Sequence, residues 1–139
     1  DQNIENKIGM KISKIFNEKG EVFFRQLEER VTLDTLKKRK NVIALGGGGF
    51  LNKNIREEIM KNHVSFWLDN NPKVLINRIK NSHKRPLAFN SNINELSLLI
   101  EKRSNIYSKA LYKVDCDNLT KTEIAKKIIN IYEHNEINS

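Results

Sequence analysis

The sequence has few of the features that cross-link a chain or anchor it in a membrane. Cys116 is the single cysteine among 139 residues, which excludes an intrachain disulfide framework and fits a reducing compartment. No apolar run approaches the length of a membrane span, and the charged first residues are unlike a secretory signal. The sequence also shows no internal repeat and no linker between domains. These absences predict one cytoplasmic domain over residues 1–139.

Positive charge is the main excess in the composition. The formal net charge is +8, a balance that suits binding to the phosphates of a nucleic acid. The lysines and arginines are spread along the chain, however, and the only dense run is residues 37–40. Such a run is more often a solvated helix end than a binding patch. We therefore expect neither a nucleic acid nor a membrane as a partner.

The spacing of apolar residues predicts helices that alternate with short strands. A first helix is expected to stop at Gly20, and a second to begin at Glu21. The side chains expected on the buried side of that second helix are Val22, Phe23, Leu27 and Val31. Strands are expected at residues 42–45, 64–68 and 112–116, and further helices at 54–61, from Pro72 onward, at 96–103 and after a capping box at 120–123. This alternation predicts an α/β fold with a parallel sheet.

Four consecutive glycines at positions 46–49 directly follow the apolar segment 42–45. Glycines at the carboxyl end of a buried strand present peptide N–H groups that can hold an anion. The alternative is a flexible turn with no ligand.

Three separated arginines are the other candidates for binding an anion, because the planar guanidinium group suits carboxylate and phosphate oxygens. Each also has an interpretation without function. Arg25 can form a structural salt bridge with Glu28, Arg85 can be a charged loop tip within the polar segment 81–94, and Arg103 can lie on a solvated helix face.

Taken in order, these segments resemble the shikimate kinase family, and the resemblance runs from residue 1 to about residue 134. The motifs that carry it are D-x-x-I-E at 1–5, F-R-x-x-E at 24–28, G-G-G at 46–48, R-P-L at 85–87 and R-x-x-x-Y at 103–107. The family implies a three-layer α/β/α fold with strand order 2-3-1-4-5. It also implies that residues 1–40 form the substrate-binding helices and that residues 81–94 form a lid.

The resemblance assigns roles to individual residues. Arg25, Gly47 and Arg103 are expected to bind the shikimate carboxylate, with Glu28 orienting Arg25. Asp1 is expected to bind the substrate hydroxyls and to act as the base. Arg85 is expected to bind the phosphates of ATP and to stabilise charge during transfer. Arg78 is expected to pack on the adenine ring. Phe16 and Phe24 are expected to line the ring pocket, and the loop 115–119 is expected to lie under the adenine.

The resemblance therefore predicts an enzyme that transfers the γ-phosphoryl group of ATP, with Mg²⁺, to the 3-hydroxyl of shikimate in aromatic amino-acid biosynthesis. Its expected partners are shikimate and ATP, and the intact protein is expected to be a monomer. The paired arginines disfavour a neutral sugar as substrate. Alternatives that stay open are a related small-molecule kinase with another acidic or polyol substrate, a non-catalytic basic binding module, and an inactive fragment.

One family motif does not occur in the 139 residues. The phosphate loop G-x-x-x-x-G-K-S/T is absent, and the aspartate that helps to hold Mg²⁺ in the family would precede residue 1, so no metal ligand is assigned. The first two strands of the family sheet are missing from the sequence as well. We therefore expect these residues to be N-terminally incomplete and, by themselves, to have no useful kinase activity.

Overall fold

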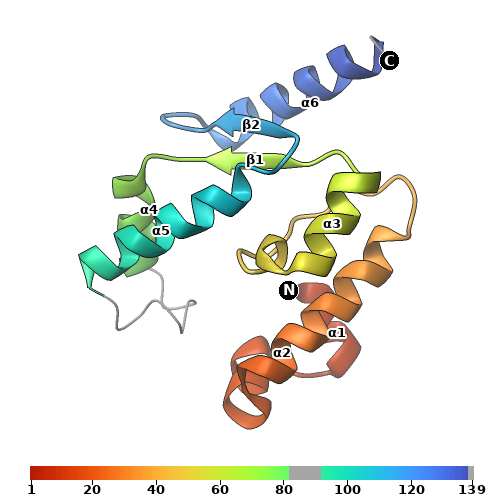
Figure 1. Cartoon of the computed structure of the whole chain (residues 1–139), viewed down its shortest axis with the longest axis vertical. Helices are drawn as coiled ribbons and strands as arrows, with labels where there is room; N and C mark the ends of the chain where they lie inside the picture. The colour runs from red at the N-terminus through yellow and green to blue at the C-terminus, as the bar shows by residue number, and fades with distance from the viewer. Residues whose placement is uncertain (82–91, 138–139) are drawn as a thin grey trace. The chain divides into compact units, whose positions relative to one another are not determined.

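The computed structural model describes residues 1–81 and 92–137, with the side chains of residues 136 and 137 left out. The chain divides into two compact units, Asp1–His63 and Val64–Ser139. In the described ranges no helix has both the length and the apolar character needed to cross a membrane. Figure 1 shows the elements of each unit.

The first unit is helical. It consists of α1 (Gln2–Ile8), α2 (Ile12–Leu36), a short 3₁₀ helix η1 (Gly49–Leu51) and α3 (Lys53–Asn62). Gly20 has a φ of 83° inside α2 and breaks its helical geometry there, so the predicted stop is confirmed. The helix α1 was not predicted; it ends at Gly9, whose φ is 70°.

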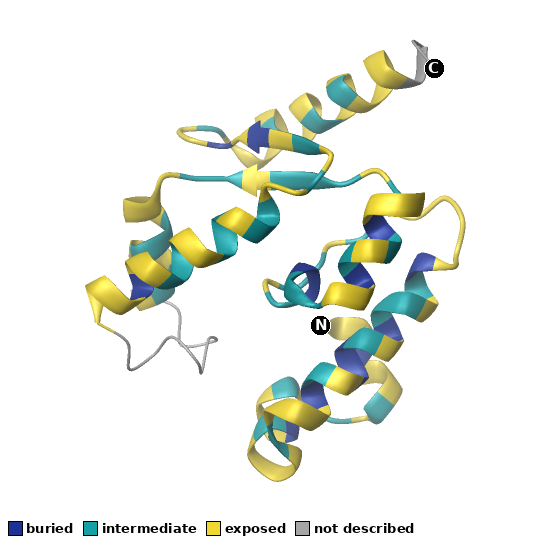
Figure 2. Cartoon of the chain, viewed as in Figure 1, coloured by how far each residue is buried: buried dark blue, intermediate teal, exposed yellow. Residues whose placement is uncertain are grey.

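The core of the first unit lies between α1 and the inner side of α2. Phe24, Leu27 and Val31 of α2 pack in one cluster with Ile4 and Ile15, and Figure 2 shows the buried positions as a stripe along α2. The prediction for the buried side was partly wrong, because Val22 is 74% exposed and Phe23 36% exposed. Helical periodicity explains the error, since positions 24, 27 and 31 share one face and positions 22 and 23 turn away from it.

The second unit contains two strands and three helices. They are β1 (Phe66–Asp69), α4 (Pro72–Lys80), α5 (Ile93–Tyr107), β2 (Tyr112–Asp115) and α6 (Lys121–Ile137). The strands are parallel, with Phe66 opposite Tyr112, and in Figure 1 α6 lies on one side of the sheet and α4 with α5 on the other. This confirms an α/β fold with a parallel sheet.

Local signals set the helix starts of the second unit. Asn71 caps α4 with Pro72 at its first position, and Thr120 exchanges hydrogen bonds with Glu123 at the start of α6, as predicted. A second capping box, Asn92 with Glu95, starts α5 and was missed. Of the predicted loop 81–94, residues 82–91 lie outside the described residues, and Ile93 already belongs to α5.

The predicted strand at residues 42–45 does not form. In the described part of the chain the sheet has two strands, β1 and β2, and Val42 is fully exposed. A strand requires a ladder of hydrogen bonds with a neighbour, so an apolar segment that pairs with neither β1 nor β2 remains irregular. Its role here is to carry the chain into the glycine loop, residues 46–49.

Candidate functional site: an arginine, a buried glutamate and a glycine loop

Arg25 is held by acidic residues of its own helix. Its Nη1 donates to Oε1 of Glu28 at 2.8 Å, and its Nε lies 3.7 Å from Oε1 of Glu21. Its guanidinium carbon also lies 5.3 Å from the centre of the Phe24 ring. The contacts with Glu21 and Glu28 arise because residues three and four apart share one side of a helix. The Arg25 side chain is nevertheless 32% exposed, so its guanidinium is fixed in direction and still open to an anion.

Glu28 links this arginine to the glycine loop. It is buried, with 5% exposure, and a buried carboxylate needs a charged or hydrogen-bonding partner. One oxygen, Oε1, accepts from Arg25, and the other lies 3.5 Å from where a Cβ of Gly46 would stand. The predicted role of Glu28 in orienting Arg25 therefore has the required contact.

The glycine loop lies against the Arg25 guanidinium. The N–H of Gly49 donates to the carbonyl of Gly46 at 2.9 Å and closes a turn. A Cβ at Gly48 would overlap the guanidinium and lie 2.7 Å from its carbon atom. The backbone can approach Arg25 this closely only because position 48 has no side chain.

The structure thus brings together several residues that the sequence singled out. Oδ1 of Asp1 lies 3.4 Å from the Cβ position of Gly46, on the same loop that touches Arg25. Gly47 is exposed in the middle of this loop. The rings of Phe16 and Phe24 are in contact, with centroids 4.7 Å apart. A guanidinium, peptide N–H groups and a nearby carboxylate suit a small acid that also carries hydroxyls.

A second set of contacts at this site was not predicted. Glu29 accepts from the side-chain amide of Asn52 at 2.6 Å and from that of Asn54 at 2.9 Å. The hydrogen bonds from Asn54 and Asn52 lower the pKa of Glu29 from its usual value. A sequence can indicate that an asparagine such as Asn52 caps a helix. It does not indicate that the same asparagine contacts Glu29, more than twenty positions earlier.

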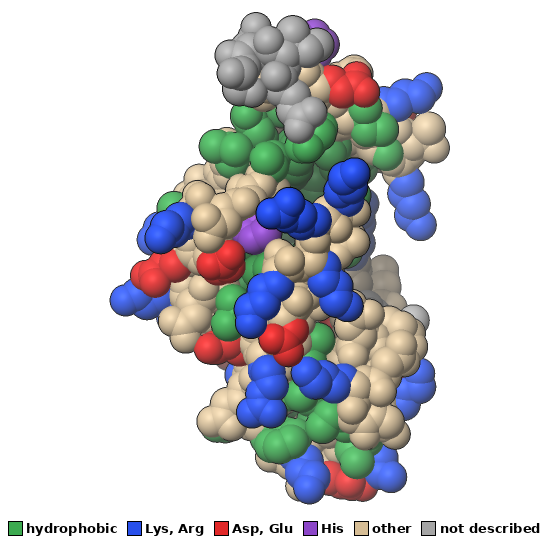
Figure 3. Space-filling model, turned by 90° about the vertical axis from the view of Figure 1, so that its right-hand side faces the viewer, with side chains coloured by type: hydrophobic (Ala, Val, Ile, Leu, Met, Phe, Trp, Pro, Cys, Tyr) green, Lys and Arg blue, Asp and Glu red, His purple; other side chains and the backbone are tan. Residues whose placement is uncertain are grey.

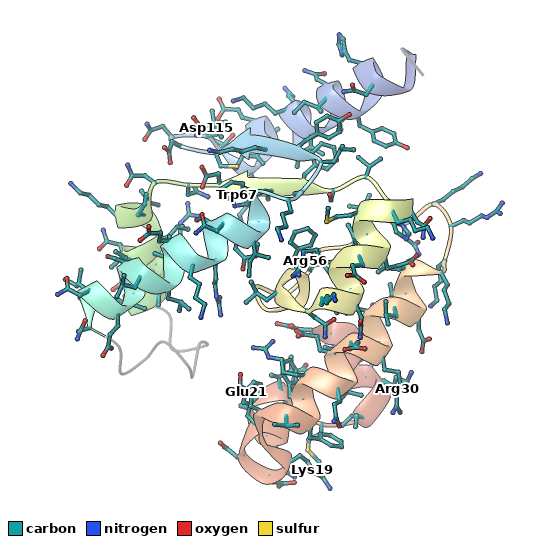
Figure 4. All side chains as sticks on the ribbon, viewed as in Figure 1. Lys19, Glu21, Arg30, Arg56, Trp67 and Asp115 are labelled. Carbon is teal, nitrogen blue, oxygen red and sulfur yellow. The ribbon has the colours of Figure 1, made fainter. Side chains whose placement is uncertain are left out.

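A shallow cavity of about 390 Å³ adjoins these residues within the first unit. Its lining residues are Glu21, Val22, Arg25, Gln26, Glu29 and Asn52. Arg25 therefore contacts the glycine loop and also borders open space. Figure 4 shows the side chains of this unit, with Glu21 and Arg30 labelled on α2.

The other predicted site residues belong to the second unit or are not described. Arg103 lies on α5, and its Nε is buried without a hydrogen-bond partner among the described residues. Tyr107, four residues after Arg103 on the same helix, packs against Trp67 of β1, and the two ring centroids are 6.3 Å apart. Arg78 is exposed on α4, and Arg85 lies outside the described residues.

A cavity of about 370 Å³ in the second unit lies at the carboxyl ends of both strands. Its lining includes Asp69 and Asp115, the last residues of the two strands, and residues 70–72 and Asp117, which follow them. Ligands of open parallel sheets bind at this end, and the loop predicted to lie under the adenine begins here.

No group of three His, Cys, Asp or Glu side chains that could hold a metal ion occurs within residues 1–81 and 92–137. On the face drawn in Figure 3, acidic side chains lie among the lysines and arginines.

The fold and the site together define an α/β protein in which an arginine, paired with a buried glutamate, lies against a glycine loop. The sequence model of the shikimate kinase family matches residues 1–133. The shikimate kinase of Bartonella quintana is 37% identical, in an alignment that covers 99% of this chain and 68% of that protein. The chain belongs to the shikimate kinase family, whose members are ATP-dependent kinases.

Solved structures agree with this assignment. Shikimate kinase from Aquifex aeolicus superposes with a TM-score of 0.87 at 32% identity, covering all of this chain and 82% of that one. Shikimate kinase from Acinetobacter baumannii, solved in complex with shikimate, gives a TM-score of 0.88 at 27% identity, with 97% and 76% covered. The family and the α/β fold expected from the motifs are therefore confirmed.

Proposed function

We propose that this chain binds shikimate through the site in its first unit, for transfer of the γ-phosphoryl group of ATP to the 3-hydroxyl. The observation that carries the proposal is the contact of Arg25 with both Glu28 and the bare backbone of Gly48. A purely structural salt bridge has no need of a glycine packed against its guanidinium. An anion-binding site does, because a peptide N–H and a guanidinium then act on the same carboxylate.

Each residue has a distinct task in this proposal. Arg25 and an N–H of the glycine loop, with Gly47 at its centre, bind the substrate carboxylate, and Arg103 is the second carboxylate ligand. Asp1 binds the hydroxyls and takes the proton of the 3-hydroxyl as its oxygen forms a bond to the γ-phosphorus. The bond from the γ-phosphorus to the bridging oxygen breaks in the same transfer. Positioning and charge stabilisation are the main demands of this chemistry.

The nucleotide side of the proposal rests on the family pattern. Arg78 stacks on the adenine, the loop 115–119 lies under it, and Arg85 stabilises charge on the transferred group. We also propose that the reaction takes place in the cytoplasm, that it serves aromatic amino-acid biosynthesis, and that the intact enzyme is a monomer. The buried free thiol of Cys116 is compatible with a reducing compartment.

The test is shikimate binding measured by isothermal titration calorimetry on the chain and on two matched variants. Arg25→Ala is expected to weaken binding at least tenfold, because a charge-assisted, bidentate contact is lost. Arg30→Ala removes an exposed arginine of the same helix and is expected to bind as the wild type does. The methyl ester of shikimate, which has no carboxylate charge, is expected to bind weakly to all three. Equal affinity of the Arg25 and Arg30 variants would refute the carboxylate assignment.

A further inference from the structure

The glycine loop is attached to α2 at both of its ends. At its start, Gly46 and Gly48 lie against Glu28 and Arg25. At its far end, past η1, Asn52 donates to Glu29. Arg25 and Glu29 are four residues apart, so about 6 Å of rigid helix, slightly more than one turn, separates the two points of attachment. The helix therefore sets how far the loop can move along it.

Asn52 connects this attachment to the start of α3. Its Oδ1 accepts from the N–H of Ile55 at 3.0 Å and caps the helix, while its Nδ2 donates to Glu29. Asn54, in the first turn of α3, donates to the second oxygen of Glu29 at 2.9 Å. The Glu29 carboxylate thus holds two side chains at the beginning of α3, one on each oxygen.

The segment between Gly48 and Asn52 is short and hydrogen-bonded throughout. The N–H of Leu51 donates to the carbonyl of Gly48, and that of Asn52 donates to the carbonyl of Gly49, both at 3.2 Å. Arg56 of α3 reaches back and donates to the carbonyls of Phe50 and Leu51 at 3.1 and 3.0 Å, and Figure 4 shows it beside η1. A displacement of Asn52 is therefore passed on to Gly48.

We propose that Glu29 is a positioning residue for the substrate-binding loop, and that it sets the distance between the glycine backbone and the Arg25 guanidinium. The inference rests on the proposed function for its effect on shikimate, but the arrangement of the loop can be tested without any ligand. Glu29 itself lies beside the proposed carboxylate site and does not touch the reacting atoms.

The two hydrogen bonds that position 29 accepts can both form only if its side chain is a carboxylate. Two amide N–H₂ groups face it, and only a carboxylate offers an acceptor oxygen to each. In Glu29→Gln one oxygen becomes an N–H₂ group, so either Asn52 or Asn54 loses its acceptor. Replacing Asn52 with aspartate in the same chain reverses one bond: the introduced amide donates to the introduced carboxylate, Asn54 keeps its acceptor, and aspartate still caps α3.

The experiment compares the wild-type chain with Glu29→Gln, the double variant Glu29→Gln/Asn52→Asp, and a control, Glu57→Gln. Glu57 is an exposed residue of α3 that pairs with Lys53 at 3.7 Å. The first readout is amide hydrogen exchange, measured by NMR in the absence of ligand at Gly49, Leu51 and Asn52. The second is the dissociation constant of shikimate, and the third is the midpoint of thermal unfolding.

In Glu29→Gln we expect exchange at the three loop amides to quicken and shikimate binding to weaken by about tenfold, the loss that one charge-assisted hydrogen bond commonly represents. The double variant is expected to return both towards wild-type values, and Glu57→Gln is expected to leave both unchanged. A merely stabilising role predicts instead a lower unfolding midpoint with unchanged affinity in the folded chain.

The outcomes separate this inference from the proposed function. Unchanged loop exchange in Glu29→Gln overturns the inference whether or not shikimate binds. Faster exchange with unchanged affinity overturns it too, because the loop would then not need positioning. Failure of the wild-type chain to bind shikimate counts against the proposed function, and the exchange data of the four chains still decide whether Glu29 holds the loop.

Discussion

A methyl group at position 48 is expected to disrupt binding without unfolding the protein. In Gly48→Ala the new Cβ would stand 2.7 Å from the guanidinium carbon of Arg25, whereas ordinary contacts begin near 3.4 Å. The atom it would meet is at the end of a flexible side chain, which can swing away, so the backbone need not move. Shikimate binding is weakened nevertheless, because the displaced side chain, Arg25, is the proposed ligand of the substrate.

The magnitude follows from the geometry of Arg25. Its guanidinium has to retreat by at least about 0.7 Å, because the carbon is that far inside ordinary contact and Nη1 lies closer still. The nitrogen closest to Gly48, Nη1, is also the one that donates to Glu28 at 2.8 Å, and this bond is lost or weakened by the retreat. A hydrogen bond between charged groups contributes about 1.5–3 kcal/mol, so shikimate affinity should fall by roughly 10- to 100-fold.

Gly49→Ala is the matched control. A Cβ at Gly49 would stand 3.5 Å from the nearest atom of Leu45, an ordinary contact, and we expect little change in affinity. Titration calorimetry with shikimate measures both variants, and thermal unfolding confirms that both are folded. If Gly48→Ala binds as well as Gly49→Ala, the contact between the loop and Arg25 has no part in binding, and the reasoning about this site is wrong.

Three further predictions concern stability. Leu96→Ala, at a fully buried position of α5, should lower the free energy of unfolding by about 2–5 kcal/mol, while the exposed Leu98→Ala should change it by less than about 0.5 kcal/mol in urea titrations. Thr120→Ala removes the cap of α6 and should cost about 1 kcal/mol, with Thr122→Ala as its comparison. The hydrogen bonds from Thr120 lower the pKa of Glu123 from its usual 4.5, so the stabilisation by Glu123 is complete above that value and is lost as the pH falls through the lower pKa of the folded state. Glu123→Gln should therefore lose less stability than the wild type between about pH 6 and about pH 3, and an equal loss would contradict this role.

Short-range features of the chain could be predicted well. The break at Gly20, the asparagine and proline that start α4, and the capping box at Thr120 each depend on residues within one turn of backbone. The pairing of Arg25 with Glu28 belongs to the same class, because the F-R-x-x-E spacing places both on one side of a helix. The predicted strand at residues 42–45 was wrong because a strand is not a local feature. The segment is apolar, as a strand often is, but it forms a strand only where a neighbouring strand pairs with it.

The amino-acid sequence by itself determined the family, the alternation of helices and strands, and the residue types that suit an acidic substrate, because motifs and helix caps are local patterns along the chain. Only the tertiary structure decided that Gly48 lies against Arg25, that Glu28 is buried beside Gly46, and that Glu29 holds Asn52 and Asn54. These contacts join residues about twenty or more positions apart. Packing of the helices around one core sets their distances, and no spacing along the chain encodes them.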